Sequence, residues 1–364
     1  MRIGIFTIHA AFNCGAMLQA FATQKIIERL GSHQVEIIDY YPLDLEQSNR
    51  GRLTKKGIRN LLKYIFSYLL PSSQSKSRNF ILFRNKMNLS QRYYSLDKLY
   101  EDPPLYDLYV VGSDQMWNME NGFRTVCFLD FVPVGKRKIA YAASFGTNDI
   151  PPEYKRQLPS LLNSFSDISC REKDGVRILR ESIKEEVTHV LDPTFMLSAE
   201  EWLQCIVPCS LKIKGDYILF YSMESVQYRK EYYKLLKNKF GYKTVEICLG
   251  LKSNPAVDKS LLNVGPSEFV HLINNASIVC TASFHGLAFA LNFEKQFFLF
   301  SLSDNYSSRN SRMESLIDTL DLKSQCVSGL DYDFSLQVDY SLVRARLQEE
   351  KMRSLKFLKK AIEK

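Results

Sequence analysis

A histidine that directly follows an apolar strand-like run is the first candidate for chemistry in this sequence. Residues 277–282 are almost entirely apolar or small, and His285 and Gly286 follow where a second apolar segment begins. An imidazole can hold or transfer a proton near neutral pH, and a helix that opens at Gly286 favours an anion at its start. A core histidine bonded to backbone is the alternative, but the position at a strand end favours a functional His285.

Two other strand ends carry charged residues. Arg171 ends a run whose other residues are predicted to be buried, and a guanidinium there costs several kcal/mol to desolvate without an anionic partner. That partner is either a ligand or Glu172, in a structural ion pair. Asp114 follows the apolar run 108–111 and Gly112, so it either caps a following helix or accepts a proton from a substrate hydroxyl.

Sugar-binding groups are predicted on the same side of the molecule. In the segment 13–20, NCGAMLQA, Gly15 precedes a helical pattern, and its neighbours Asn13 and Gln19 carry amides. An ordinary turn between strand and helix is the alternative interpretation of this segment. Trp117 is either a platform for a sugar ring or a core residue.

These residues need parallel strands to bring them to one edge. Strand-like runs alternate with helical patterns, which is typical of βαβ units and predicts two parallel sheets. The predicted strands are 2–7, 35–39, 106–112, 138–145, 166–171, 188–192, 217–222, 244–249, 277–282 and 296–301, and the clearest helices are 16–30, 266–276 and 341–364. We expect an α/β protein with Rossmann-like domains at 1–205 and 206–330 and a basic helical tail at 331–364.

Composition limits the class of partner. The 364 residues carry a formal charge of +8 and a pI near 8.9, which favours anionic partners. No aromatic-basic strand motif indicates nucleic acid. The eight cysteines form no C-x-x-C pair, so we expect reduced thiols in a cytoplasmic protein and no metal site. No signal peptide or membrane-spanning run is expected. The basic amphipathic segment 52–70 is either an inserted helix or a peripheral contact with an anionic membrane.

Six motifs in this order resemble the polysaccharide pyruvyl transferase family. They are NCGAMLQAFATQ (13–24), VVGSDQMWN (110–118), YAASFG (141–146), REKDG (171–175), VLDPTFML (190–197) and ASFHGLAFALNFEKQF (282–297), and the resemblance covers roughly residues 1–325. It implies a GT-B-like fold, in which two Rossmann-like halves face each other across a cleft. It also implies transfer of pyruvate from phosphoenolpyruvate onto two hydroxyls of a sugar as a cyclic ketal, with release of phosphate and without a cofactor.

The resemblance assigns roles to matching residues. Arg171 matches an arginine that binds the donor, and His285 matches the histidine of the C-terminal half. Where similar proteins have an arginine two residues before that histidine, this chain has Ser283. Arg309 and Arg312 follow the last core strand and are candidates to replace the missing cation.

Chemistry and resemblance together give the leading hypothesis. Phosphoenolpyruvate requires cations and helix starts around its carboxylate and phosphate. His285 is the expected acid, Asp114 the expected base, and the acceptor is a glycan or a lipid-linked glycan precursor. The alternatives are a glycosyltransferase that uses a nucleotide sugar on the same scaffold, and a non-catalytic sugar-binding subunit of a polysaccharide assembly complex.

Overall fold

The first half of the chain forms one parallel sheet. The computed structural model describes residues 1–42, 71–120, 122–209, 211–223, 229–249, 252–301 and 311–364. The first sheet has seven strands in the order β3-β2-β1-β4-β5-β6-β7. They are β1 (Arg2–Phe6), β2 (Gln34–Tyr40), β3 (Leu89–Tyr93), β4 (Leu108–Val111), β5 (Arg137–Ala143), β6 (Phe165–Cys170) and β7 (Val187–His189). This is a Rossmann-like order in which the winding reverses between β1 and β4.

The second half forms a second parallel sheet. Its six strands have the order β10-β9-β8-β11-β12-β13. They are β8 (Tyr217–Tyr221), β9 (Lys243–Ile247), β10 (Lys259–Leu261), β11 (Ile278–Thr281), β12 (Gln296–Phe300) and β13 (Cys326–Val327). The central strands of both sheets are buried on both faces, as a sheet covered by helices requires. The prediction of an α/β fold with two Rossmann-like, GT-B-like halves is confirmed.

Helices connect and cover these strands. They are α1 (Cys14–Arg29), α4 (Pro71–Arg84), α5 (Leu96–Glu101), α6 (Pro152–Lys155), α7 (Leu158–Leu162), α8 (Lys173–Ser182), α9 (Ala199–Cys205), α10 (Arg229–Phe240), α11 (Pro266–Asn275), α12 (Phe284–Asn292), α13 (Ser311–Leu320) and α14 (Tyr340–Glu363). Three short 3-10 helices are η1 (Thr125–Phe128), η2 (Pro193–Met196) and η4 (Lys323–Gln325). The three helices predicted from the sequence correspond to α1, α11 and α14.

The predicted strands are present, and the strands that the sequence did not reveal are β3, β10 and β13. Each of these three lies at an edge of its sheet. An edge strand buries less surface, so β3 is polar (LSQRY) and the other two span only three and two residues. Apolar runs reveal central strands, and these edge strands carry no such run.

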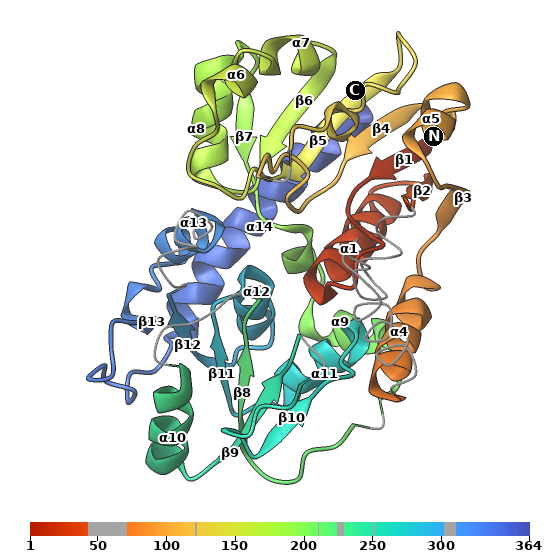
Figure 1. The fold of residues 1–364 in the computed structure, drawn as a ribbon. Coiled ribbons are helices and arrows are strands. Elements are labelled where there is room, and N and C mark those ends of the chain that lie inside the picture. Colours follow the sequence, from red (N-terminus) through yellow and green to blue (C-terminus); the bar gives the residue numbers. More distant parts are fainter. Residues whose placement is uncertain (43–70, 121, 210, 224–228, 250–251, 302–310) are drawn as a thin grey trace.

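The two sheets share one hydrophobic core. Figure 1 shows the first sheet above the second, with α1, α11 and α12 between them. The largest cluster of buried residues includes Ile5 of β1, Leu18 of α1, Phe269 of α11, Phe289 of α12 and Leu219 of β8. The outer face of each sheet has a smaller cluster of its own. The two halves are therefore held together by apolar packing, and the ends of their strands are fixed relative to each other.

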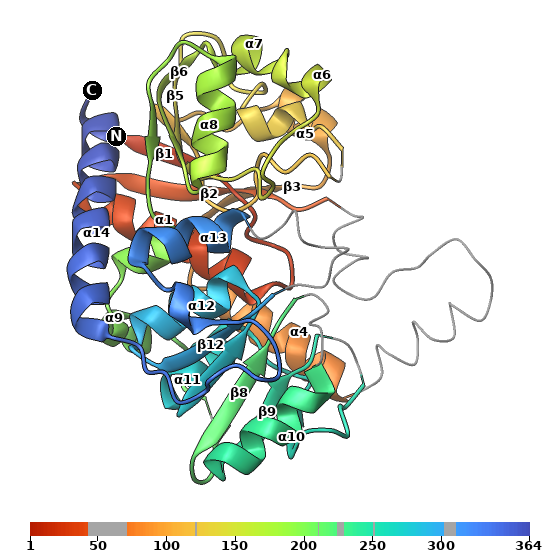
Figure 2. The same ribbon diagram turned by 90° about the vertical axis from the view of Figure 1, so that its left-hand side faces the viewer.

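Helix α14 ties the second half back to the first. Figures 1 and 2 both show it running along the molecule from the second sheet to the first. Near its start, Tyr340 Oη donates to the carbonyl of Ala290 (3.3 Å). Farther along, Ser354 Oγ accepts from the backbone N–H of Leu191 (2.9 Å), and the carbonyl of Ala361 accepts from Arg137 (2.8 Å). The predicted C-terminal tail is thus a helix that packs against both halves of the protein. The division of the two domains at residue 205 remains a prediction.

Helix α4 makes a crossing in the opposite direction. It belongs to the first half by sequence but contacts the loop before α11, where Asn79 Nδ2 donates to the carbonyl of Asn263 (2.9 Å). The basic segment 52–70, expected to be an inserted helix or a membrane contact, lies outside the described residues. In the part of the chain that the structure describes, we find no helix with the length and hydropathy that a membrane span requires.

Removing the apolar contact of α14 should destabilise the whole protein. Leu358 is fully buried in the shared core. We expect Leu358→Ala to lower the free energy of unfolding by about 2–5 kcal/mol, because it leaves a cavity. Met352→Ala, on the exposed side of the same helix, should change it by less than about 0.5 kcal/mol. Urea titration followed by circular dichroism measures both free energies of unfolding. Equal effects of the two substitutions would contradict the packing of α14 against the shared core.

Candidate functional site

Arg171 lies at the carboxyl edge of the first sheet between two carboxylates. It directly follows β6, and its side chain is 1% exposed. Nη1 donates to Asp192 Oδ2 at 2.6 Å, and Nη2 lies 3.4 Å from Asp114 Oδ1. Burial by itself would lower the pKa of Arg171, but the charges of Asp192 and Asp114 raise it above its usual value. The guanidinium also lies over the ring of Phe284, 4.4 Å from its centre.

Asp192 connects strand ends of the first sheet. Its carboxylate accepts from Arg171 and from Ser113 Oγ (2.8 Å) through Oδ2, and from the N–H and hydroxyl of Thr194 (2.9 and 2.7 Å) through Oδ1. Burial would raise the pKa of Asp192, yet the charge of Arg171 and the bonds from Thr194 hold it below the usual value. The site therefore contains a permanent, buried negative charge.

His285 approaches the same carboxylate from the second half of the protein. Its Nε2 lies 3.8 Å from Asp192 Oδ2 and has no hydrogen-bond partner among the described residues. Burial lowers the pKa of His285, against the opposing effect of Asp192 and Asp114. The ring is thus mostly neutral at pH 7, with a buried nitrogen able to take or give a proton.

Gly15 of α1 provides the space for this histidine. A Cβ atom at position 15 would lie 2.1 Å from His285 Nδ1. Only glycine allows the helix and the ring to approach this closely. The first and last of the sequence motifs therefore meet in space, which joins the two halves of the protein at the site.

Arg312, on the first turn of α13, is a second cation near this cluster. Burial and then the charge of Arg171 lower the pKa of Arg312 to about 10, while Asp114, Glu172 and Asp192 act in the opposite direction. Its Nε is buried and has no partner within the described chain. A guanidinium with unused donors beside a buried cluster is suited to bind an anion.

Other buried polar atoms near this cluster also lack partners. Within the described ranges they are Arg171 Nε and Tyr141 Oη, besides His285 Nε2 and Arg312 Nε. Most buried polar atoms in native proteins are hydrogen-bonded, because an unsatisfied one costs about 1–3 kcal/mol. Their concentration here is the mark of a site that a polar ligand completes.

Two alternatives raised by the sequence are not what the structure shows. The side-chain partners of Arg171 are Asp192 and Asp114 and not Glu172, whose Oε1 instead accepts from the backbone N–H groups of Phe145 and Gly146 (2.8 and 3.2 Å). Asp114 caps no helix, since a turn follows it. It adopts a left-handed conformation with φ of 73°, which Asp tolerates better than most residues.

The residues expected to bind a sugar have mainly structural places. Asn13 caps α1, where its Oδ1 accepts from the N–H of Ala16 (3.2 Å). Gln19 is fully buried and fastens the loop after β1 by donating to the hydroxyl of Thr7 and the carbonyl of Ile8. Trp117 is 1% exposed and stacks on Phe128, which makes it a core residue and excludes it as a sugar platform.

The segment around His285 is placed as follows. Ser283 is the N-cap residue of α12 but makes no side-chain cap bond, and it is 8% exposed. Gly286 is the third residue of that helix, and a Cβ atom there would lie 2.2 Å from Thr281 Oγ1, so its role is close packing. Arg309 lies outside the described residues.

The sequence pattern does not reveal Asp192, the residue on which the site converges. Its position at the end of the run 188–192 predicts a strand end, yet β7 ends at His189 and Asp192 precedes η2. An acidic residue directly after an apolar run was the available signal, the same signal that drew attention to Asp114. Phe284 gave no such signal, because its contact with Arg171 exists only in the folded chain.

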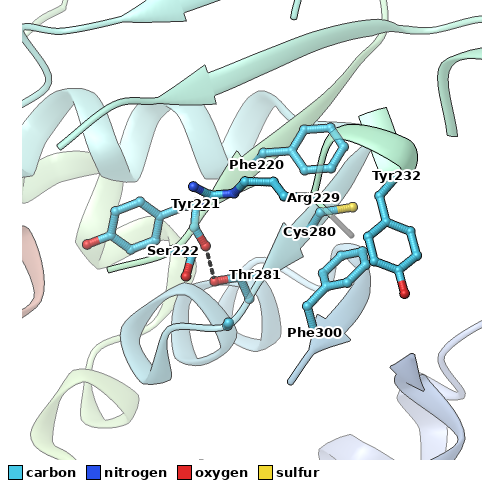
Figure 3. Close-up of a pocket in the computed structure, with 9 residues that line it drawn as sticks. Phe220, Tyr221, Ser222, Arg229, Tyr232, Cys280, Thr281 and Phe300 are labelled. Atoms are coloured by element: carbon cyan, nitrogen blue, oxygen red, sulfur yellow. Dashed lines mark hydrogen bonds between the residues drawn. The ribbon is translucent and has the colours of Figure 1, made fainter. Parts of the chain in front are cut away.

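A small hollow lies at the carboxyl ends of β8, β11 and β12 (Figure 3). Aromatic side chains, among them Phe220, Tyr232 and Phe300, line it together with Arg229. The hydroxyl of Thr281 donates to the carbonyl of Tyr221 (2.6 Å), which ties the two strands together at this point. Neither Arg171 nor His285 lines this hollow, so it is separate from the charged cluster.

Within the described ranges, no three His, Cys, Asp or Glu side chains are grouped so as to hold an ion, and all eight cysteines are free thiols.

A family model supports the resemblance seen in the sequence. The model described as "Polysaccharide pyruvyl transferase" matches residues 13–304, which include every candidate residue above except Arg309 and Arg312. A comparison with curated proteins gives no significant match.

Solved structures with a related shape are distant. The UDP-GlcNAc 2-epimerase of Methanocaldococcus jannaschii has 13% identity and a TM-score of 0.48, over 95% of this chain and 98% of its own. The Neisseria meningitidis UDP-GlcNAc 2-epimerase bound to UDP-GlcNAc gives 13% and 0.47, over 98% and 100%. The E. coli heptosyltransferase WaaC, with ADP-2-deoxy-2-fluoro heptose, gives 10% and 0.39, over 82% and 88%. The strand order defines the fold independently of these neighbours.

Adding one methyl group at Gly15 should disturb His285. The clash with Nδ1 must move the buried ring or α1, so we expect Gly15→Ala to lower the free energy of unfolding by about 1–3 kcal/mol. Gly31→Ala is the matched control, since its Cβ would meet only the tip of the half-exposed His33 side chain (2.7 Å). Urea denaturation compares the two, and a Gly15→Ala protein as stable as the control would exclude the close contact.

The histidine that supports Arg171 should make the protein sensitive to acid. His189 donates through Nε2 to the carbonyl of Arg171 (3.1 Å), and burial, followed by the charge of Lys173, lowers the pKa of His189 to about 4. The unfolded chain takes up this proton at a higher pH than the folded one, so stability falls as the pH drops from about 6.5 to about 4. We expect His189→Asn to remove on the order of 2 kcal/mol of that loss.

The measurement is the free energy of unfolding at several pH values in that window. His33→Asn serves as the control, because His33 is less deeply buried. An unchanged pH profile in the His189→Asn protein would refute the assignment.

Proposed function

Because the chain belongs to the polysaccharide pyruvyl transferase family, we propose that it transfers pyruvate from phosphoenolpyruvate onto a sugar as a cyclic ketal. The observation that carries this proposal is the convergence of Arg171, Asp114, Asp192 and His285, from both halves of the protein, on one buried cluster. The acceptor in this proposal is a sugar of a surface polysaccharide or of its lipid-linked precursor.

The donor carries a carboxylate and a phosphate, which need cations with unused donors. Arg171 already donates its shortest hydrogen bond to Asp192. In this proposal it therefore contributes positive charge to the site and is held in a fixed position by Asp192. Arg312 retains a buried Nε without a partner among the described residues. We assign Arg312 to the donor anion, in the role that an arginine at position 283 would have in similar proteins.

His285 is suited to the proton transfer that starts the reaction. A proton goes to C3 of the donor, the oxygen of one sugar hydroxyl bonds to C2, and that hydroxyl loses its proton. The C2–O bond to phosphate then breaks, the second hydroxyl bonds to C2, and its proton goes to the departing phosphate. In the protein alone burial keeps His285 largely neutral, and a bound dianion would raise the pKa of His285 and so make it an acid.

Asp114 is the candidate base for the sugar hydroxyls. Its side chain is 9% exposed. Its Oδ1 lies 3.4 Å from Nη2 of Arg171, which is a longer contact than the 2.6 Å between Arg171 and Asp192. Asp192, in contrast, has no exposed surface and accepts from three side chains, so it orients Arg171 and His285. Two carboxylates in one cluster thus have different environments and, in this proposal, different tasks.

The test incubates purified protein with phosphoenolpyruvate and a panel of glycosides, and measures released phosphate. We expect His285→Gln to lower kcat by about 100-fold or more, since it removes the acid. Arg312→Gln should raise KM for phosphoenolpyruvate by about tenfold, because it removes a charged contact. Arg177→Gln, at an exposed arginine paired with Glu181 on α8, is the control and should change neither.

The contrary outcomes separate the alternatives. Absence of phosphate release with every acceptor, together with no donor binding in calorimetry, refutes the proposal. A melting temperature raised by a nucleoside diphosphate and not by phosphoenolpyruvate would indicate a glycosyltransferase. An unchanged cellular polysaccharide in a strain with His285→Ala would indicate a non-catalytic subunit.

A further inference from the structure

A second group of charges lies at the same edge of the first sheet, outside the site described above. It consists of His9, Asp39, Arg84 and Arg92, and we call it the Asp39 cluster. Asp39 Oδ1 accepts from His9 Nε2 (3.1 Å) and Arg84 Nη2 (2.5 Å), and Oδ2 accepts from Arg92 Nε (3.0 Å). Asp39 is near the carboxyl end of β2 and His9 follows β1, so both belong to the edge where ligands bind in such sheets.

Both ring nitrogens of His9 face oxygen atoms in this arrangement. Its Nδ1 lies 3.0 Å from the carbonyl oxygen of Thr7 and its Nε2 lies 3.1 Å from the carboxylate of Asp39. A ring nitrogen that carries a proton can donate to either of these acceptors. The ring is buried, at 2% exposure, and held by both contacts.

The Asp39 cluster therefore places two guanidinium groups and one imidazole around a single carboxylate. Burial would raise the pKa of Asp39, but His9, Arg84 and Arg92 together hold it far below the usual range. One carboxylate cannot neutralise two guanidinium groups, and Arg84 Nε is buried without a partner in the described chain. A purely structural ion pair needs no such excess, whereas a binding site for an anion does.

The cluster is open to solvent on the side of Arg92. Its side chain is 36% exposed, and its guanidinium lies 4.9 Å from the ring centre of Tyr41 and 5.9 Å from that of Tyr94. Tyr94 is 51% exposed, so a flat apolar face and a hydroxyl stand beside the charge. A ligand with a negatively charged group next to a ring-shaped polar body fits this surface.

Hydrogen bonds connect the cluster to the candidate catalytic site. The carbonyl of Thr7 accepts from His9, the hydroxyl of Thr7 donates to the carbonyl of Ser113 (3.0 Å), and the hydroxyl of Ser113 donates to Asp192. Thr7 follows β1 and Ser113 follows β4, so this chain of bonds crosses the point at which the winding of the sheet reverses. Groups bound on the two sides of that point can belong to one substrate.

We propose that the Asp39 cluster binds an anionic oxygen group of the acceptor sugar, either a phosphate ester or a carboxylate. This inference rests on the proposed function, because it identifies the ligand as the acceptor. Arg92 and Arg84 contact the anion, Tyr94 packs against the sugar ring, and His9 with Asp39 holds the two guanidinium groups in place.

The test measures binding of neutral and charged sugars by calorimetry. The probes are glucose, galactose and mannose, their 1-phosphates and their uronic acids, each titrated into the wild-type protein. We expect one charged series to bind at least about tenfold more tightly than the neutral sugars, and Arg92→Gln and Arg84→Gln each to remove this difference. Preference for the 1-phosphates identifies a phosphate-bearing acceptor, and preference for the uronic acids identifies a carboxylate-bearing one.

Arg2→Gln is the matched control. Arg2 lies at the opposite edge of the same sheet, pairs with Glu36 (3.7 Å) and stands over the ring of Tyr106 (5.3 Å), so it has the same types of neighbour. It should bind the charged sugars as the wild type does. Equal binding of charged and neutral sugars, or equal effects of Arg92→Gln and Arg2→Gln, would overturn the inference.

Donor binding separates this inference from the proposed function. Arg92→Gln should leave the Kd of phosphoenolpyruvate unchanged, whereas Arg312→Gln should raise it. If phosphoenolpyruvate does not bind at all while charged sugars still depend on Arg92, the proposed function fails and the anion site stands. Circular dichroism and melting curves of each variant confirm folding, and Arg92→Lys, which keeps the charge, should retain part of the affinity.

Discussion

The carboxylate of Asp192 is the interaction on which the candidate site depends. It is buried, and it receives bonds from Arg171, Ser113 and Thr194, while Nε2 of His285 lies 3.8 Å away. Without Asp192 the buried guanidinium of Arg171 would keep only the longer contact with Asp114 (3.4 Å) among the described carboxylates, and a poorly compensated buried charge costs several kcal/mol. Asp192 thus makes it possible to keep a cation inside the protein at the meeting point of the two halves.

Rigid packing surrounds that charge. The core shared by both sheets and the crossing of α14 fix the strand ends, and the missing side chain of Gly15 lets α1 approach the ring of His285. Preorganised groups of this kind need little rearrangement during a reaction. Some buried polar atoms have no partner in the described chain, and this lowers the stability of the protein without a ligand. Hydrogen bonds from a bound ligand would offset this loss.

Positive charge is distributed along one edge of the first sheet in two places. Arg171 and Arg312 stand on one side of the point where the winding reverses, and the Asp39 cluster stands on the other. The two places differ in their balance of charge, since Arg171 has two carboxylate neighbours while the carboxylate of Asp39 faces two guanidinium groups. In our proposals, the first place serves a small donor anion and the second an acceptor with its own charge.

Much of the fold and part of the site follow from the sequence. The central strands are long enough and apolar enough to be recognised. Arg171, Asp114 and His285 stand out because each is an ionisable residue that follows such an apolar strand. Edge strands such as β3 were missed because they bury too little to carry an apolar pattern. For Trp117 the sequence left two interpretations open, a sugar platform or a core residue, because the residue type alone cannot distinguish them, and its burial decides for the core.

The sequence by itself determined the class of fold, the order of its elements and the family. Local periodicity and the motifs around strand ends depend on residues that are neighbours in the chain, so they can be recognised from the sequence. Only the tertiary structure decided that Asp192 is the partner of Arg171 and His285, that Gly15 makes room for a histidine 270 positions away along the chain, and that His9, Arg84 and Arg92 meet at Asp39. These properties arise from distances between residues far apart along the chain, and burial then strengthens the charges that meet there.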